Sequence, residues 1–196
     1  MKHIMIFESF LNGKVICYHG TGNKTSDYMN IFKNGFKIGT GANYGPGIYS
    51  FYNIEDLIND SFYSKLTIIE SEIINLDKFL ITSPSTAKEI FGKFDIFDQV
   101  SRIMGETWAR HNIDEIRKIE EDISLPFVLL DKGRYSREDS PEFKRKKSVL
   151  GKELKGWIFD EGHKRDSVWV VCYDEKYIIP KRYSTDLGKT WKKPTD

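Results

Sequence analysis

The sequence predicts an α+β fold in one domain of 196 residues. Runs rich in Ile, Val, Tyr and Phe lie near both ends of the chain, and apolar residues recur at helical spacing between them. With 39% hydrophobic and 14% aromatic residues, the chain has enough apolar material for one substantial core. We therefore expect the two ends to supply the strands, and residues from about 84 to 148 to form a helical insertion.

A hairpin is expected to open the fold. Residues 4–9 and 14–18 are apolar and β-prone, and the dipeptide Asn12-Gly13 between them is favoured in tight hairpin turns. His19 then lies at the end of a strand.

A short helix is expected next. Ser26 is placed to cap a helix at 26–34, and Gly35 supplies its C-terminal stop. A glycine-rich connection spans 39–47. The pattern then predicts a strand at 48–51, a helix at 54–61 and a β-rich run at 65–74.

The middle of the chain changes to a helical period. Two apolar series have this spacing: Ile96, Phe97, Val100, Ile103, Met104 and Trp108, and then Ile113, Ile116, Ile119 and Ile123. Residues 131–148 contain Gly, Pro and a run of four basic residues, which predicts an exposed loop. Strands return at 156–161 and 167–173, as a second hairpin, and at 177–179.

Charge and cysteine content argue against a nucleic-acid-coating protein and against a disulfide-bonded, secreted one. Thirty basic and twenty-nine acidic residues give a net charge of +1, which argues against a surface built as a whole to coat nucleic acid or a membrane. Cys17 and Cys172 lie in apolar β-like runs, where reduced, buried thiols are expected. Because no stretch has the roughly 18 apolar residues of a membrane span and no secretory signal is evident, a cytoplasmic protein without a membrane partner is expected.

Two short segments carry the candidate chemistry. Residues 18–21, Tyr-His-Gly-Thr, place His19 beside a glycine at a strand end, and residues 44–50, Tyr-Gly-Pro-Gly-Ile-Tyr-Ser, place glycines before Tyr49. Such segments would hold an imidazole and a phenol on opposite sides of one cleft. A flat cationic ring such as nicotinamide suits that arrangement, and glycines let the backbone approach a ligand closely.

The two segments resemble the first and second signatures of the ADP-ribosyltransferases related to diphtheria toxin and the poly(ADP-ribose) polymerases, the His-Tyr-Glu class. The resemblance covers residues 15–80 well and 156–180 loosely. It implies split antiparallel β-sheets, NAD as the substrate, a bond from His19 to a hydroxyl of the adenosine ribose, and stacking of Tyr49 on the nicotinamide. The implied NAD-binding set is His19, Gly20, Thr21, Tyr44, Gly47, Tyr49 and Tyr63, with Tyr44, Tyr52 or Tyr63 as the opposite wall of the nicotinamide slot.

The third signature of the class, a glutamate that opens a late strand, has no acidic counterpart. Alignment of Val-Trp-Val-Val at 168–171 with the usual Glu-Tyr-Val-Val places the acid at Val168, and a slip of one residue gives Ser167 or Trp169. Three nearby carboxylates are candidates to replace it, although each also fits a solvated hairpin end. With His19 and Tyr49, the expected catalytic set therefore contains Asp160, Glu161 and Asp166.

Other patterns do not complete a known site. Residues 39–44 put tyrosine where the third glycine of a dinucleotide fingerprint belongs, and residues 20–25 lack the glycine before the lysine of a phosphate-binding loop. The four histidines are scattered without metal-ligand spacing, so no metal is expected. The basic run 144–147 fits a solvated face, with an acidic target or a nucleic acid as the alternative.

The sequence therefore predicts a NAD-dependent mono-ADP-ribosyltransferase, a glycosyltransferase that modifies a macromolecule, with a protein favoured over a nucleic acid. The alternative is a non-catalytic module that binds NAD, ADP-ribose or a partner on the same fold, which the missing glutamate favours. RNA 2′-phosphotransferase chemistry is a more distant candidate, because it needs several basic residues around a phosphate. The Ile-, Lys- and Asn-rich composition suits a bacterium or its phage, and by analogy an effector, toxin or counter-defence protein.

Overall fold

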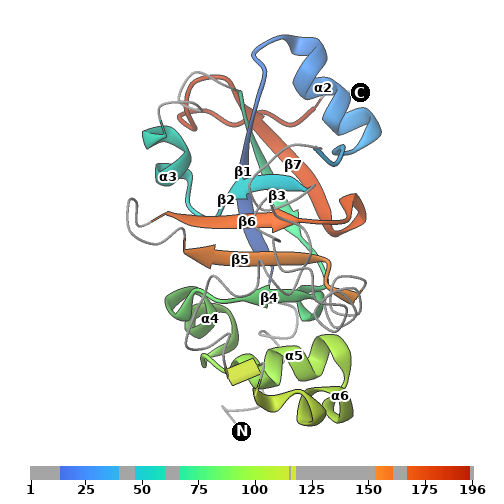
Figure 1. The fold of residues 1–196 in the computed structure, drawn as a ribbon. Helices are drawn as coiled ribbons and strands as arrows, with labels where there is room; N and C mark the ends of the chain where they lie inside the picture. Colours follow the sequence, from blue (N-terminus) through green and yellow to red (C-terminus); the bar gives the residue numbers. More distant parts are fainter. Residues whose placement is uncertain are drawn as a thin grey trace, which may run out of the picture.

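The computed structural model describes residues 14–39, 47–60, 67–114, 116–117, 153–160 and 167–194. Its centre is a seven-stranded sheet of order β4-β5-β6-β2-β1-β3-β7 (Figure 1). The strands are β1 (Val15–Thr21), β2 (Ile48–Phe51), β3 (Thr67–Ile73), β4 (Phe79–Ile81), β5 (Gly156–Asp160), β6 (Val168–Cys172) and β7 (Ile178–Ser184). Neighbours pair antiparallel except β4 and β5, which are parallel. The expected α+β class is confirmed, and the sheet is mixed where a wholly antiparallel arrangement was expected.

The helices lie in the regions that the sequence predicts to be helical, with different ends. They are α2 (Thr25–Asn34), α3 (Ile54–Asn59), α4 (Pro84–Phe91), α5 (Ile96–Met104) and α6 (Glu106–His111), with 3₁₀ turns η1 (Leu76–Lys78) and η2 (Glu175–Tyr177). Ser83 caps α4 through the Thr86 N–H, and Asp95 caps α5 through the Asp98 N–H at 2.8 Å. The stop at Gly35 is confirmed by its positive φ of 77°. The expected cap at Ser26 is wrong, because α2 begins after Lys24 and has no side-chain cap.

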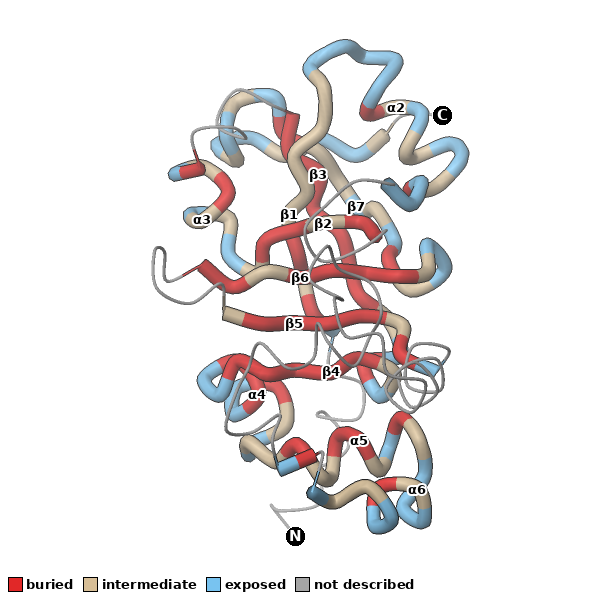
Figure 2. Tube along the Cα trace, in the orientation of Figure 1, coloured by how far each residue is buried: buried red, intermediate tan, exposed pale blue. Residues whose placement is uncertain are grey.

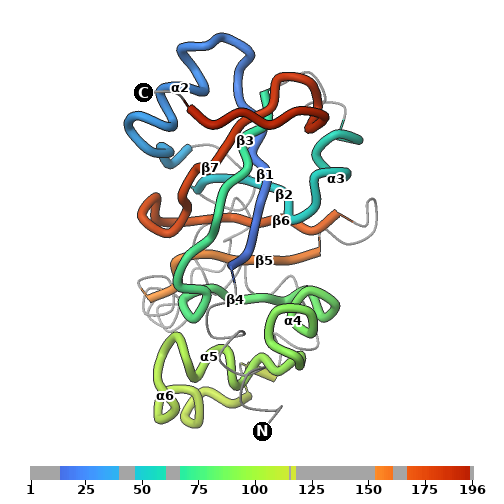
Figure 3. The backbone as a smooth tube through the Cα atoms, turned by 180° about the vertical axis from the view of Figure 1, so that it is seen from behind, coloured from blue at the N-terminus to red at the C-terminus, as the bar shows by residue number. Residues whose placement is uncertain are grey.

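The sheet consists of two parts that meet at a single residue pair. Strands β1, β3 and β7 run together along the molecule, whereas β2, β6, β5 and β4 run across it (Figures 1 and 3). The only register pair between β1 and β2 in the described chain is Tyr18 with Phe51, although β1 pairs with β3 over its whole length. Beyond that pair β1 and β2 separate, and His19 is the next residue of β1.

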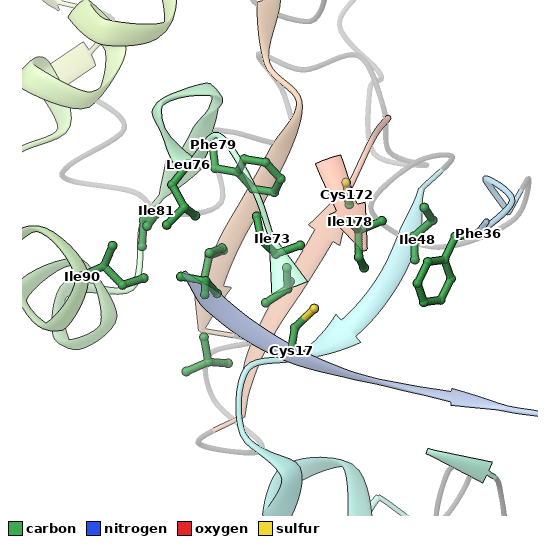
Figure 4. Packing of buried hydrophobic residues seen from close by; sticks show 14 of the residues in the cluster. Cys17, Phe36, Ile48, Ile73, Leu76, Phe79, Ile81, Ile90, Cys172 and Ile178 are labelled. Atoms are coloured by element: carbon green, nitrogen blue, oxygen red, sulfur yellow. The ribbon is translucent and has the colours of Figure 1, made fainter. Parts of the chain in front are cut away.

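Three apolar clusters stabilise this arrangement. The first lies between the two parts of the sheet and includes Cys17, Phe36, Ile48, Ile73 and Cys172 (Figure 4). The second packs β5 and β6 against α5 and α6 around Trp157, and the third joins Phe51, Leu57 and Ile68 beneath α3. Buried residues accordingly concentrate on β2, β3, β4, β5 and β6, whereas β1 and β7 are partly exposed and most exposed residues lie on the helices and turns (Figure 2). Cys17 and Cys172 are both buried thiols that form no disulfide, as the sequence predicts.

The outer strand β4 is bonded on its free side by a side chain of α5. Gln99, which is buried, accepts a hydrogen bond from the Ile81 N–H at 2.7 Å and donates to the Ile81 carbonyl at 3.0 Å. Next to it, the Trp157 indole N–H donates to the Thr82 hydroxyl at 2.9 Å. Helices α4, α5 and α6 thus pack at the β4 end of the sheet, where the expected insertion begins (Figure 1).

The remaining expectations have mixed outcomes. The strands at 48–51, 65–74, 156–161 and 167–173 and the helices at 26–34 and 54–61 are confirmed with small changes of their ends. The strand at 4–9 and the loop at 131–148 lie outside the described residues, as does the whole of the expected insertion after residue 117. Among the helices that the structure describes, none has both the length and the apolar composition to cross a membrane.

Candidate functional site

His19 lies where β1 and β2 separate. Its Nδ1 is 2.6 Å from the main-chain carbonyl oxygen of Tyr49, 30 residues further along the chain. A carbonyl can only accept, so Nδ1 carries the proton and donates it. The ring also meets Phe36 edge-on, with centroids 5.2 Å apart and planes at 80°. The imidazole therefore supplies a donor to β2 at the point where the main-chain pairing of the two strands has ended.

The surroundings keep this imidazole neutral. Burial lowers the pKa of His19 below its usual range, and the hydrogen bond to Tyr49 opposes that shift only in part. With the proton fixed on Nδ1, Nε2 is an acceptor. His19 as a residue is half-buried. The sequence-based role for His19 requires such an acceptor.

The Tyr49 ring contacts a different set of side chains from His19. Tyr49 pairs with Val171 of β6, and its ring lies edge-on to Trp169, with centroids 6.4 Å apart and planes at 74°. It packs against the second apolar cluster, whereas Phe36, the neighbour of His19, belongs to the first. By register, Tyr49 and Phe51 share one face and His19 takes the other. The structure therefore joins His19 to the main chain of Tyr49 but puts the two rings on opposite faces, so the expectation that they face each other across one cleft is wrong.

The glycine before β2 has a packing role that the sequence did not reveal. A Cβ on Gly47 would lie 2.7 Å from a methyl of Val171 and 3.2 Å from the carbonyl of Cys172. Gly47 also exchanges two main-chain hydrogen bonds of 3.2 Å with Gly39. Close approach to β6, and not only to a ligand, thus accounts for this glycine.

The structure describes only some of the other residues that were expected to bind NAD. Gly20 and Thr21 continue β1 opposite Ile68 and Thr67, and both are partly exposed. Tyr52 is engaged elsewhere: burial and a hydrogen bond to the Glu89 carboxylate raise the pKa of its phenol. Four expected site residues lie outside the described residues: Tyr44, Tyr63, Glu161 and Asp166.

The third-signature position is occupied by apolar side chains. Val168 is the first residue of β6, is buried, and belongs to the first cluster together with Cys17. Ser167 is buried, and Trp169 packs on Phe51 with centroids 4.2 Å apart. A one-residue shift of the alignment therefore brings no acid to this strand.

Two carboxylates nevertheless lie around Val168. Asp160, the last residue of β5, is its direct register partner and is half-buried. Opposite residues of an antiparallel pair have Cβ atoms about 5 Å apart on the same face. From the other side, Asp56 of α3 accepts the Val168 N–H through Oδ2 at 3.3 Å. Asp160 is thus the expected substitute that the structure places beside the position of the missing glutamate.

Asp56 was missed by the sequence interpretation. Its contact with Val168 spans 112 residues, so no local pattern announces it. One feature of the sequence could have drawn attention to Asp56, which lies in the first turn of the helix that follows Tyr49 and Phe51. Acidic residues are favoured at the start of any helix, however, so this position alone does not indicate a site. The Tyr52 N–H donates to the Val168 carbonyl at 2.9 Å, so β2, α3 and β6 are bonded to one another at this point.

A second charged arrangement flanks the candidate site on the Tyr18 side. Arg182 of β7 donates to both oxygens of Glu70, at 2.7 and 2.6 Å, and its guanidinium lies over the Trp191 ring at 4.8 Å. The centroid of the Tyr18 ring lies 6.1 Å from that of the Trp191 ring. Because both carboxylate oxygens of Glu70 accept hydrogen bonds from Arg182, Glu70 is unsuited to replace the missing glutamate.

In the part of the chain that the structure describes, no group of three His, Cys, Asp or Glu side chains is arranged to hold a metal ion. Comparisons of the chain with family models, curated proteins and solved structures found no match.

Proposed function

We propose that the protein is a NAD-dependent mono-ADP-ribosyltransferase that modifies a macromolecule. The observation that carries the proposal is the neutral His19, held by the Tyr49 carbonyl at 2.6 Å where β1 and β2 separate. A sheet in two parts joined by the pair Tyr18 and Phe51 is compatible with the split sheet that the resemblance implies. The proposal combines this geometry with that resemblance.

Each strand end would then bind one part of NAD. Nε2 of His19 accepts from a hydroxyl of the adenosine ribose, and the main chain of Gly20 bonds the nicotinamide amide. Tyr49 borders the nicotinamide from the β2 side, where a cation over its ring would gain about 0.5–2 kcal/mol. The two rings lie on opposite faces at the junction between the two parts of the sheet, so a ligand that contacts both of them has to span that junction.

The reaction breaks the bond between the nicotinamide nitrogen and C1′ of its ribose. The bonding pair leaves with nicotinamide, which departs neutral, and a nucleophile of the acceptor bonds C1′ and loses its proton. The ribose develops oxocarbenium character in between, as in glycoside cleavage. A carboxylate is needed to stabilise that cation, and in this proposal Asp160 supplies it while Asp56 holds the start of β6.

A non-catalytic NAD-binding module is the alternative, and one observation favours it. Val168 fills the place of the signature glutamate with a buried apolar side chain. Loss of one preorganised stabilising group typically costs about 10²–10³ in rate. If Asp160 does not compensate, the fold would bind NAD or ADP-ribose and act by docking onto a partner.

Calorimetry with NAD, together with an assay of released nicotinamide, separates the two. Binding with release of nicotinamide, and transfer of label from tagged NAD to protein, supports the transferase. Binding without release supports the module. Absence of NAD binding by the folded protein would contradict both. Mass spectrometry of a treated bacterial lysate then identifies the acceptor, for which a protein remains the favoured class.

A further inference from the structure

Two serine side chains on the inner strands are buried without a hydrogen-bond partner. Ser50 of β2 is 1% exposed and Ser71 of β3 is fully buried, and no other protein atom bonds either hydroxyl. The equally buried hydroxyl of Ser184 instead donates to Asp186 at 2.7 Å. Because a buried hydroxyl without a hydrogen bond is unfavourable, native proteins usually satisfy such groups, in many cases with an internal water molecule.

Cys17 belongs to β1, the strand between the two that carry these serines. Cys17 is the register partner of Ser71, and opposite residues of an antiparallel pair have Cβ atoms about 5 Å apart on one face. Burial raises the pKa of Cys17 to about 12, and the nearby hydroxyl of Ser50 opposes that shift only in part. The thiol and this hydroxyl are close, but their geometry is not that of a hydrogen bond. Three small polar side chains are therefore neighbours.

These side chains face the first apolar cluster, at the junction between the two parts of the sheet. Tyr18 and Phe51 are the one register pair of β1 and β2 in the described chain, and their side chains take one face. Cys17 and Ser50, which precede them, take the other face, with His19. Cys17 points into the cluster in Figure 4. The polar side chains thus lie where main-chain bonds between β1 and β2 are scarce.

The ladder between β3 and β7 is irregular at the same place. The register shifts between Glu70 and Ser71, and the residue opposite Ser71 is Pro180, which has no N–H to donate. A bulge of this kind locally disrupts the ladder. Serine and cysteine are also much smaller than the isoleucine and phenylalanine side chains of the cluster. A buried water needs a polar site with room, and small polar side chains beside a bulge favour both.

We propose that Ser50, Cys17 and Ser71 bind an internal water molecule, which joins β2, β1 and β3 across the junction. Their hydroxyls and thiol supply as many partners as a buried water typically has, which is about two to four. A metal ion does not suit this donor set, because the hydroxyls are neutral and the thiol stays protonated, whereas metals take thiolate, imidazole or carboxylate ligands. An apolar ligand would leave both hydroxyls unsatisfied. The site is independent of NAD and of the proposed reaction.

Thermal unfolding of a small set of variants tests the proposal. Ser50→Ala and Ser71→Ala should each lower the thermal midpoint by about 2–4 °C, because the water loses one partner and the remaining hydroxyl becomes unsatisfied. The double variant should lose no more than either single one, since it leaves no hydroxyl to satisfy. Ser101→Ala is the matched control, because its hydroxyl on α5 is also unpartnered. Its midpoint should stay the same or rise, since alanine favours a helix.

Oxygen-17 relaxation dispersion of the solvent water counts long-lived internal water directly. The signal of the wild-type protein should exceed that of Ser71→Ala by about one water molecule, and Ser101→Ala should match the wild type. Unchanged or higher midpoints in Ser50→Ala and Ser71→Ala would overturn the proposal, because they would mean that the hydroxyls are buried dry. So would losses that add in the double variant, or an equal internal-water signal in Ser71→Ala and the wild type.

Discussion

His19 donates a hydrogen bond from Nδ1 to the carbonyl of Tyr49 at 2.6 Å, and so connects the two candidate site segments through the main chain. The bond fixes the imidazole tautomer and gives the Tyr49 carbonyl of β2 a donor from β1 beyond the last register pair of the two strands. One side chain thus has a structural and a proposed ligand-binding role. The two roles can be separated by substitution.

His19→Ala should abolish NAD binding and nicotinamide release. It also removes the hydrogen bond from His19 to the Tyr49 carbonyl and the contact with Phe36, so the free energy of unfolding should fall by about 1–3 kcal/mol. Chemical denaturation and calorimetry with NAD measure the two effects. His19→Gln is the control, because its amide can restore part of the stability. Full labelling activity in His19→Ala would contradict the proposed site.

The lowered pKa of His19 predicts a pH dependence of stability. Above about pH 6.5 the ring is neutral in both folded and unfolded chains. As the pH falls below that value, the unfolded chain takes up a proton that the folded chain resists, so stability decreases until the folded pKa is passed and is then level. The difference between wild type and His19→Gln isolates this contribution. Nuclear magnetic resonance titration should find the pKa of the ring below that of an unperturbed histidine, and an ordinary or raised pKa would contradict the expectation.

Asp160→Asn should lower nicotinamide release by about 10²–10³ if Asp160 replaces the third-signature acid. Its thermal midpoint should change little, since Asp160 is half-buried at the end of β5. Asp77→Asn, on an exposed turn, is the control. An unchanged rate in Asp160→Asn would exclude this residue from catalysis.

Gly156→Ala should destabilise the fold by about 1–3 kcal/mol or more. The added Cβ would lie 1.9 Å from the Phe79 ring, which is buried in the first cluster between β4 and β5. Gly92→Ala is a comparison in which the Cβ has open space and only the positive φ of 73° opposes it, at a cost of about 1 kcal/mol. Denaturant titration of both variants should rank Gly156→Ala as the more damaging.

The two thiols should be unreactive in the native protein. Burial raises the pKa of Cys17 to about 12, and Cys172 is fully buried as well. The thiolate is the reactive form, so a disulfide reagent at pH 8 should modify neither cysteine until denaturant is added. Rapid modification of one thiol in the native state would show that the first cluster opens locally.

The sequence predicted much of the sheet because its signals are local. β2 and β6 are short apolar runs bounded by turn residues, and α2 ends at a glycine with positive φ. The parallel pairing of β4 with β5 could not be read in this way, since three residues of β4 contact a strand more than 70 residues later. Local patterns specify elements, and their order in the sheet depends on packing between distant segments.

The candidate site was predictable at the level of residues but not of geometry. His19 and Tyr49 stand out by their glycine neighbours, yet their joining through a main-chain carbonyl depends on where β1 and β2 part. Asp56 follows a helix-capping pattern that many surface helices share, so its bond to Val168 is visible only in three dimensions.

The paired bonds of Gln99 to Ile81 have a consequence for self-association. An outer strand with free N–H and carbonyl groups is a template on which another chain can extend the sheet, and that is a common route to aggregation. The amide of Gln99 imitates a neighbouring peptide group, and at Ile81 it occupies the donor and the acceptor that an incoming strand would need. The sheet is thereby closed to growth at this position without a further strand.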